Sequence, residues 1–134
     1  KPICNTCDYT ATSMTLDEEF EQCRGWIESA LKLSGGTHLF QDVVECVKLG
    51  TMQLWNSPKG CMVTEILEYP QKKVFHIFLA GGDLDQIRNF SDSAIYFAKL
   101  NGCSAMTLAG RRGWVKALAQ LGWEEKFATM SVEI

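Results

Sequence analysis

The stretch that decides the fold is VFHIFLAGGD, residues 74–83, together with the pattern that follows it. Val74 to Ala80 is almost entirely apolar, which is typical of a central strand buried on both faces. Gly81, Gly82 and Asp83 then open a helical pattern that runs to Leu100. Residues 104–108 predict a second strand, and two strands joined by a single helix should be parallel neighbours.

A second loop-to-helix junction follows this second strand. GRRGW, residues 110–114, opens another helix, and LGW, residues 121–123, ends it. Two parallel strands that each end in a glycine-bearing loop at a helix N-terminus form a crevice where anions commonly bind. We therefore expect the two strands to part at their C-terminal ends and to border an anion site.

The part of the chain before these strands is helical. Residues 1–14 predict an irregular arm, and residues 15–134 predict one domain. Thr15 and Glu18 have the spacing of a capping box at the start of a helix. The apolar residues of that helix fall on one face: Leu16, Phe20, Cys23, Ile27 and Leu31. Thr37 is expected to cap a second helix, which Gly50 ends.

The remaining segments predict strands. Residues 52–55 and 61–68 are expected to be strands, and neighbours that hairpins join to the central strand should be antiparallel to it. Residues 126–134 alternate, with Ala128, Met130, Val132 and Ile134 on one face, which predicts a closing strand. The element order is α-α-β-β-β-α-β-α-β, an α/β (α+β) fold with a mixed sheet and helices on its faces.

Composition excludes several classes of function. The chain has 134 residues and a formal net charge of −3, which argues against general nucleic-acid binding because that requires a basic face. No apolar run approaches the ~20 residues that cross a bilayer. The N-terminal residues lack the apolar core of a signal peptide. We therefore expect an intracellular protein, in the cytoplasm of the cell or host cell.

The six cysteines predict no metal site. Cys4 and Cys7 have metal-ligand spacing, but no second such pair follows them. His38 and His76 are far apart in the sequence and lack the close spacing of zinc-finger histidines. Free thiols in a reducing compartment are the expected state.

The order and lengths of the elements from Thr15 onward, together with VKALAQLGW at residues 115–123, resemble the GNAT acyltransferases. The resemblance implies transfer of an acyl group from acetyl-CoA or another acyl-CoA to an amine acceptor. FLAGGDLD (residues 78–85) and LAGRRGW (residues 108–114) also resemble short GNAT-like proteins of tailed bacteriophages and prophages. That second resemblance implies an alternative, a non-catalytic protein of the phage virion or one that contacts a phage or host protein.

The resemblance also places the cofactor site. GNAT enzymes bind the CoA pyrophosphate on backbone amides of a loop that coincides here with residues 81–85. It implies that the backbone of Phe78, Ala80, Gly81 and Gly82 binds acyl-CoA. Asp83 and Asp85 depart from the family's pattern, because they put carboxylates where phosphates arrive. Asp83 also fits a plain helix N-cap, with Gln86 completing a capping box, and this is the interpretation that we favour.

The family's usual acid is missing. Many GNAT enzymes carry a tyrosine five residues before the closing aromatic, and Leu118 stands there in this chain. Where the family often has an asparagine after the preceding strand, this chain has Arg111. The carboxylates of Glu65 and Glu68 are candidates for a general base if burial raises a pKa. The alternative for Glu65 is a paired or solvent-facing strand residue.

Arg111 and Arg112 carry fixed charge between two glycines at a helix start. They are candidates for an anion site, for ion pairs with acidic residues, or for contact with a partner. The tryptophans are expected to anchor the core: Trp26, Trp55, Trp114 and Trp123. His76 is expected to be a hydrogen-bonded core residue, and Thr37-His38 part of a helix cap.

Overall fold

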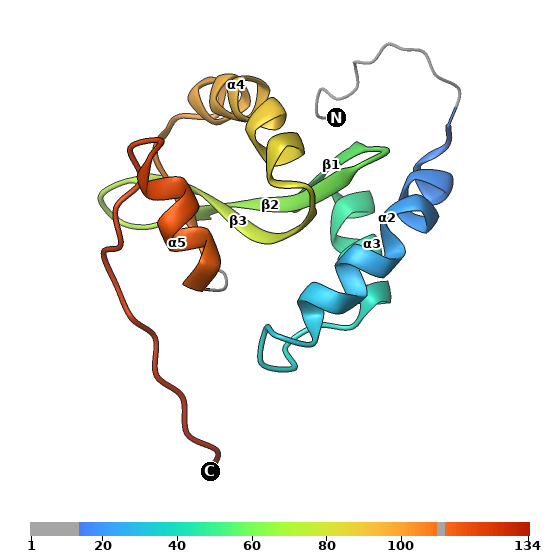
Figure 1. Ribbon diagram of the computed structural model, residues 1–134, viewed down its shortest axis with the longest axis horizontal. Coiled ribbons are helices and arrows are strands. Elements are labelled where there is room, and N and C mark those ends of the chain that lie inside the picture. The colour runs from blue at the N-terminus through green and yellow to red at the C-terminus, as the bar shows by residue number, and fades with distance from the viewer. Residues whose placement is uncertain (1–13, 110–111) are drawn as a thin grey trace.

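The computed structural model describes residues 14–109 and 112–134. Its elements follow the predicted order through the helix that comes after the fourth strand (Figure 1). The bounds are α2 Leu16–Leu31, α3 Phe40–Leu49, β1 Met52–Ser57, β2 Gly60–Glu68, β3 Lys73–Gly82, α4 Leu84–Leu100, β4 Cys103–Leu108 and α5 Arg112–Ala119.

The four strands form one mixed sheet in the order β1-β2-β3-β4. β2 pairs antiparallel with both β1 and β3, whereas β3 and β4 are parallel. The predicted mixed α/β architecture and its parallel pair are therefore confirmed.

Helices cover both faces of this sheet. α2 and α3 lie on one face, where Phe20, Ile27 and Val63 belong to one apolar cluster (Figure 1). α4 and α5 lie on the other face, where Phe75, Ala94 and Ala98 belong to a second cluster. We name these the α2/α3 face and the α4/α5 face. All four tryptophans pack into these clusters, as predicted: Trp26 on the α2/α3 face, and Trp55, Trp114 and Trp123 on the α4/α5 face.

The start of α2 follows the local sequence signal. The Thr15 hydroxyl accepts the Glu18 amide proton at 3.2 Å, and the Glu18 carboxylate accepts the Thr15 amide proton at 2.8 Å, so the predicted capping box is confirmed. Four of the five expected apolar residues of α2 are buried, and Leu16, in the first turn, remains 36 % exposed.

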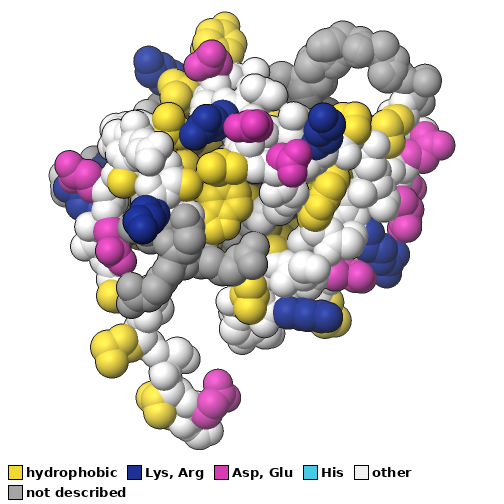
Figure 2. Space-filling model, viewed as in Figure 1, with side chains coloured by type: hydrophobic (Ala, Val, Ile, Leu, Met, Phe, Trp, Pro, Cys, Tyr) yellow, Lys and Arg dark blue, Asp and Glu magenta, His cyan; other side chains and the backbone are white. Residues whose placement is uncertain are grey.

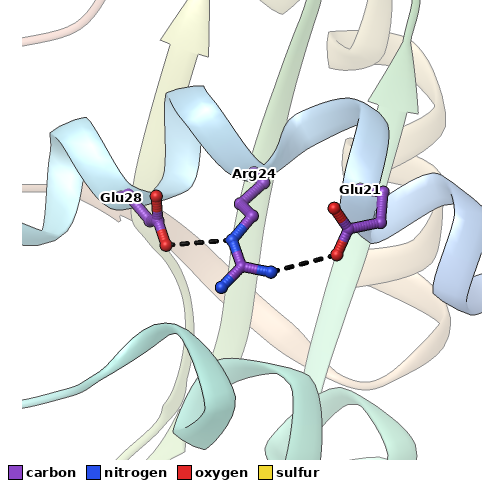
Figure 3. Close-up of polar contacts among 3 residues, drawn as sticks. All are labelled: Glu21, Arg24 and Glu28. Atoms are coloured by element: carbon purple, nitrogen blue, oxygen red, sulfur yellow. Dashed lines mark hydrogen bonds and ion pairs between the residues drawn. The ribbon is translucent and has the colours of Figure 1, made fainter.

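Arg24 joins α2 to α3 at the surface. Its guanidinium donates to Glu21 and Glu28 on the same helix, each at 3.0 Å (Figure 3). The same guanidinium lies 4.4 Å from the ring centre of Phe40 at the start of α3. The two carboxylates hold the guanidinium over the Phe40 ring. The contact between α2 and α3 therefore includes a cation–π interaction in addition to its apolar packing.

The start of α3 differs from the prediction. Leu39, not Thr37, occupies the N-cap position, and its amide donates to the Asp42 carboxylate at 2.8 Å. Thr37 lies two residues too early to reach the first amides of the helix, and its hydroxyl instead bonds Nδ1 of His38 at 2.7 Å. The predicted end is confirmed, because Gly50 follows the helix with φ of 87°.

The predicted closing strand is wrong. Residues 124–134, which we call the C-terminal segment, have no strand pairing and run away from the folded body (Figure 1). Met130 is 93 % exposed and Val132 is 81 % exposed. Alternation predicts two unlike faces, but a strand also requires a neighbouring strand to bond, and nothing in the alternation specifies one.

Candidate functional site

The two parallel strands separate at their C-terminal ends. Their pairing runs from Lys73 opposite Cys103 to Ile77 opposite Leu108. β3 then continues alone on this side to Gly82, whereas β4 ends at Leu108. The predicted parting is confirmed, and it leaves the β4-facing backbone of residues 78–82 without a strand partner among the described residues.

A β-bulge at Phe78 lies where this pairing stops. On β2, Thr64 is opposite Ile77 and Val63 is opposite Leu79, so Phe78 is the extra residue. As a result Phe78 and Leu79 both pack on the α2/α3 face, while Ile77 and Ala80 pack on the α4/α5 face. A bulge bends its strand and increases the local twist. The bulge therefore accounts for the departure of β3 from β4.

The two glycines after this bulge are packed against the protein itself. A Cβ at Gly81 would stand 2.8 Å from Cβ of Trp26 on α2. Gly82 has φ of 95° and lies against the backbone of Lys59 and Gly60 in the β1–β2 turn. At these two glycines α2 and the turn approach the backbone closely. That their backbone binds acyl-CoA stays a prediction.

The N-terminus of α4 lacks the predicted capping box. Asp83 is at the N-cap position, but its side chain makes no capping hydrogen bond. The amide of Asp83 and the side chain of Gln86, which would bond each other in the box, are instead bonded to residues at the β1–β2 turn. The Lys59 carbonyl accepts the Asp83 amide proton at 3.0 Å, and the Gln86 side chain accepts the Ser57 hydroxyl at 2.7 Å.

This arrangement leaves two donors at the helix start. Within the described chain, no hydrogen-bond partner takes the amide protons of Leu84 and Asp85. Uncapped amides at a helix N-terminus favour an anion because of their direction and the helix dipole. The site therefore offers more to a phosphate than the capped helix expected from the sequence.

Charge around these amides is mixed. Asp85 is 84 % exposed and pairs with Arg88 one turn later at 3.7 Å. Arg88 is a cation beside the helix start that sequence reasoning missed. The available signal was its position three residues after Asp85 on a helix, where opposite charges meet.

A cavity opens on the α4/α5 face beside the point where the strands part. Ile77 and Leu108, the last pair of the parallel ladder, both line it. Arg88 from α4 and Trp123 after α5 also line it. Leu118 is buried in the wall of this cavity. The position where many GNAT enzymes carry a tyrosine as general acid therefore has an apolar side chain in this chain.

The α2/α3 face carries a row of polar side chains across three strands. Glu65 on β2 is opposite His76, and His76 is opposite Thr107 on β4. Nδ1 of His76 lies 2.8 Å from the Thr107 hydroxyl, so the predicted hydrogen bond of His76 is confirmed. Burial lowers the pKa of His76, while the charge of Glu65 opposes this shift. The imidazole is therefore neutral near pH 7.

His38 extends this polar area toward the bulge. Its ring lies 4.8 Å from the Phe78 ring, centre to centre, and is tilted by 59°. His38 is thus part of the wall of the site rather than of the helix cap predicted for it. The sequence carried no signal for this contact, because it depends on how the α2–α3 loop folds over the sheet.

Two of the predicted binding residues fall outside the described structure. Arg111 lies outside the described residues, and the side chain of Arg112, the first residue of α5, is also undescribed. Their proposed contact with an anion stays a prediction.

The remaining cysteines fit the expected free thiols. Cys23 and Cys61 are buried, and the contact between them together with burial raises the pKa of the Cys23 thiol. Cys46 and Cys103 are partly exposed and free, whereas Cys4 and Cys7 lie outside the described residues.

Among described residues, no group of three or more potential ligands is arranged to hold a metal ion. No described helix has both the length and the apolar character to cross a bilayer.

Comparison with solved structures identifies the architecture. A transcriptional regulator from Bacillus halodurans C-125 matches with a TM-score of 0.66 at 13 % identity, over 93 % of this chain and 99 % of that one. An acetyltransferase of Trypanosoma brucei matches with a TM-score of 0.62 at 11 % identity, over 91 % and 97 % of the two chains. The chain has the GNAT fold.

A third structural neighbour was solved with a ligand. It is an aminoglycoside acetyltransferase from an uncultured soil metagenomic sample, in complex with sisomicin. Its TM-score is 0.59 at 12 % identity, over 86 % of this chain and 88 % of that one. Neither a family model nor a curated protein matches the chain. Because the sequence identities are only 11 % to 13 %, the similarity to these structures shows the shared fold alone.

Proposed function

We propose that the protein transfers an acyl group from acyl-CoA to an amine. The observation that carries the proposal is the parting of β3 from β4 at the Phe78 bulge, directly before a helix whose first amides are uncapped. The GNAT fold and its acetyltransferase neighbours support the same chemistry.

The residues present fit acyl-CoA in part. The amides of Leu84 and Asp85 and the guanidinium of Arg88 suit a pyrophosphate. The carboxylates of Asp83 and Asp85 oppose it by like-charge repulsion. We therefore expect binding that is specific but weaker than a helix start without carboxylates would give.

Bound acyl-CoA would supply the acyl group as a thioester, whose carbonyl carbon the amine attacks. In this proposal, a backbone amide between Phe78 and Ala80 donates a hydrogen bond to the carbonyl oxygen as negative charge develops there. The chain needs no covalent intermediate of its own for this step, since the amine nitrogen forms the new bond as the carbon–sulfur bond breaks.

The polar row on the α2/α3 face is suited to the amine. Glu65 attracts a protonated amine to the sheet. His76 can accept its proton at Nε2 in the tautomer whose Nδ1–H donates to Thr107, and its lowered pKa keeps it neutral for this role. Because Leu118 has no proton to give, the leaving thiolate takes one from solvent.

Acetyl-CoA titration by thermal unfolding tests the proposal. A ligand at ten times its dissociation constant adds about 1.4 kcal/mol of stability, which raises Tm by several degrees. Product formation with a panel of primary amines, followed by mass spectrometry, then tests transfer. The absence of both a Tm shift and an acylated product at high acetyl-CoA would refute acyl transfer. That result would favour the non-catalytic alternative.

The phage association is a separate proposal. It is supported by the resemblance of residues 78–85 and 108–114 to phage-encoded GNAT-like proteins. A pull-down with purified virion proteins, using the full chain as bait, tests whether it contacts a phage component.

A further inference from the structure

An apolar strip crosses the α2/α3 face next to the polar row. Leu67 on β2 is opposite Val74 on β3, and Val74 is opposite Ala105 on β4. Each of the three is one residue away from a member of the α4/α5 cluster, so alternation places them on the α2/α3 face. Among the described residues, none of them belongs to the cluster that packs under α2 and α3. We call these three residues the apolar strip.

The strip continues the line that starts at the bulge. Along β3, Phe78, His76 and Val74 follow one another at intervals of two residues, or about 6.6 Å. Val74 is only 5 % exposed, whereas Leu67 and Ala105 on either side of it are partly exposed. An amine whose nitrogen lies at His76 and faces Phe78 therefore has its remaining atoms over the apolar strip.

The carboxylate of Glu65 at the near end of the strip is available to an ammonium group. Acidic and basic side chains are mixed over the visible surface (Figure 2), and ion pairs join several of them. No salt bridge within the described chain engages Glu65, which is partly exposed. This carboxylate can therefore hold one ammonium group beside His76.

The far end of the strip offers no such partner. Lys72 lies there, two residues before Val74, and its carbonyl accepts the Tyr69 amide proton at 2.9 Å. The nearby Glu68 carboxylate is already paired with Lys73 at 3.3 Å. A second ammonium group would lose water over the apolar strip and approach the cation of Lys72.

We propose that the amine acceptor is a monoamine with an apolar body, bound with its nitrogen at the polar row and its body on the apolar strip. The inference rests on the proposed acyl transfer and names the class of its acceptor. The products are an amide, the CoA thiol and one proton released to solvent, since the ammonium group loses two protons and the leaving thiolate takes one. Polyamines are disfavoured by the same arrangement.

Acyl transfer from acetyl-CoA to three amines tests the proposal on the unmodified chain. Hexylamine and hexamethylenediamine have the same carbon chain and differ by one ammonium group, and ethylamine is too short to cover the strip. We expect kcat/KM for hexylamine to exceed that for either other amine by roughly tenfold or more, because its methylenes leave water. The gain should lie mainly in KM, since the strip contacts the part of the amine that does not react.

The variant Leu67→Glu puts a carboxylate on the strip and should reverse the order of the two longer amines. Leu100→Glu is the matched control, since it adds the same charge at a side chain of α4 that is 66 % exposed, and it should keep the order of the unmodified chain. Thermal unfolding of both variants shows whether they fold.

Several results would overturn this acceptor class and leave acyl transfer standing. They are similar kcat/KM values for the three amines, a preference of the unmodified chain for hexamethylenediamine, or a folded Leu67→Glu variant that keeps the original order. The amine panel on the unmodified chain decides the proposal whether or not the variant folds. Transfer to none of the amines would overturn the acceptor class together with acyl transfer itself.

Discussion

Replacing Asp85 by Asn should tighten the binding of CoA. The Asp85 carboxylate is in the first turn of α4, next to its own free amide and to that of Leu84. It is 84 % exposed and lies 3.7 Å from Arg88, so it both repels a phosphate and occupies a cation that would attract one. The substitution removes the repulsion and releases Arg88 at the same time.

The size of this effect follows from Coulomb's law. Two like unit charges about 4 Å apart repel by about 1 kcal/mol in water and by about 4 kcal/mol near a protein surface. The smaller figure alone corresponds to roughly a fivefold change in Kd. The same substitution should lower stability by about 0.3–1 kcal/mol, because an acidic side chain in the first helical turn interacts favourably with the dipole. Tighter binding by a less stable variant cannot result from general stabilisation.

Calorimetric titration with CoA at low and at high salt measures the effect, which should shrink as salt rises. Asp92→Asn is the matched control. It removes the same charge from an exposed residue of the same helix, about 10 Å further along. A gain of similar size in Asp92→Asn, no gain in Asp85→Asn, or tight binding by the unmodified chain would each mean that the phosphate site lies elsewhere.

Three further predictions concern stability and charge. In a urea titration, Gly82→Ala should lower the free energy of unfolding by roughly 1–3 kcal/mol or more, since φ is 95° and the new Cβ meets the backbone of Lys59 and Gly60. Gly35→Ala, with φ of 82° and open space around it, should lower the free energy of unfolding by less. His76 binds a proton less readily when folded, so stability should fall as pH drops below about 6.5; unfolding at about pH 5.5 and about pH 7.5 should show a smaller difference for His76→Gln, and an unchanged difference would exclude His76 as the cause. Arg111→Glu/Arg112→Glu should abolish CoA binding and leave Tm unchanged, whereas unaltered binding would make the two arginines plain surface residues.

Local signals in the sequence predicted local structure well. The capping box at Thr15 forms because both of its partners are three residues apart on the same helix. The apolar run of residues 74–80 predicted β3, and the single helix after it predicted a parallel neighbour. These features depend on residues close in sequence to each element, or on the general rule that two strands joined by a single helix are parallel neighbours.

The features that the sequence did not predict depend on distant partners. The same box pattern at Asp83 fails because Lys59 and Ser57, far earlier in the chain, take its donor and its acceptor. The bulge at Phe78 arises from register with β2, which an uninterrupted apolar run does not encode. The His38–Phe78 contact likewise forms only when the α2–α3 loop meets the sheet. The candidate site is built mainly from such contacts, so its position was predictable and its details were not.

The bond between the Lys59 carbonyl and the Asp83 amide limits how the protein can evolve. Hairpin turns commonly tolerate insertions because they end in solvent. Here the turn between β1 and β2 is fastened to the start of α4, and Gly82 fits tightly against it. Lengthening the turn by one residue would displace the Lys59 carbonyl, free the Asp83 amide and alter the geometry of the helix start. Relatives that keep the same helix start should therefore keep the turn at its present length, while the loop at Gly35 and Gly36 is free to vary.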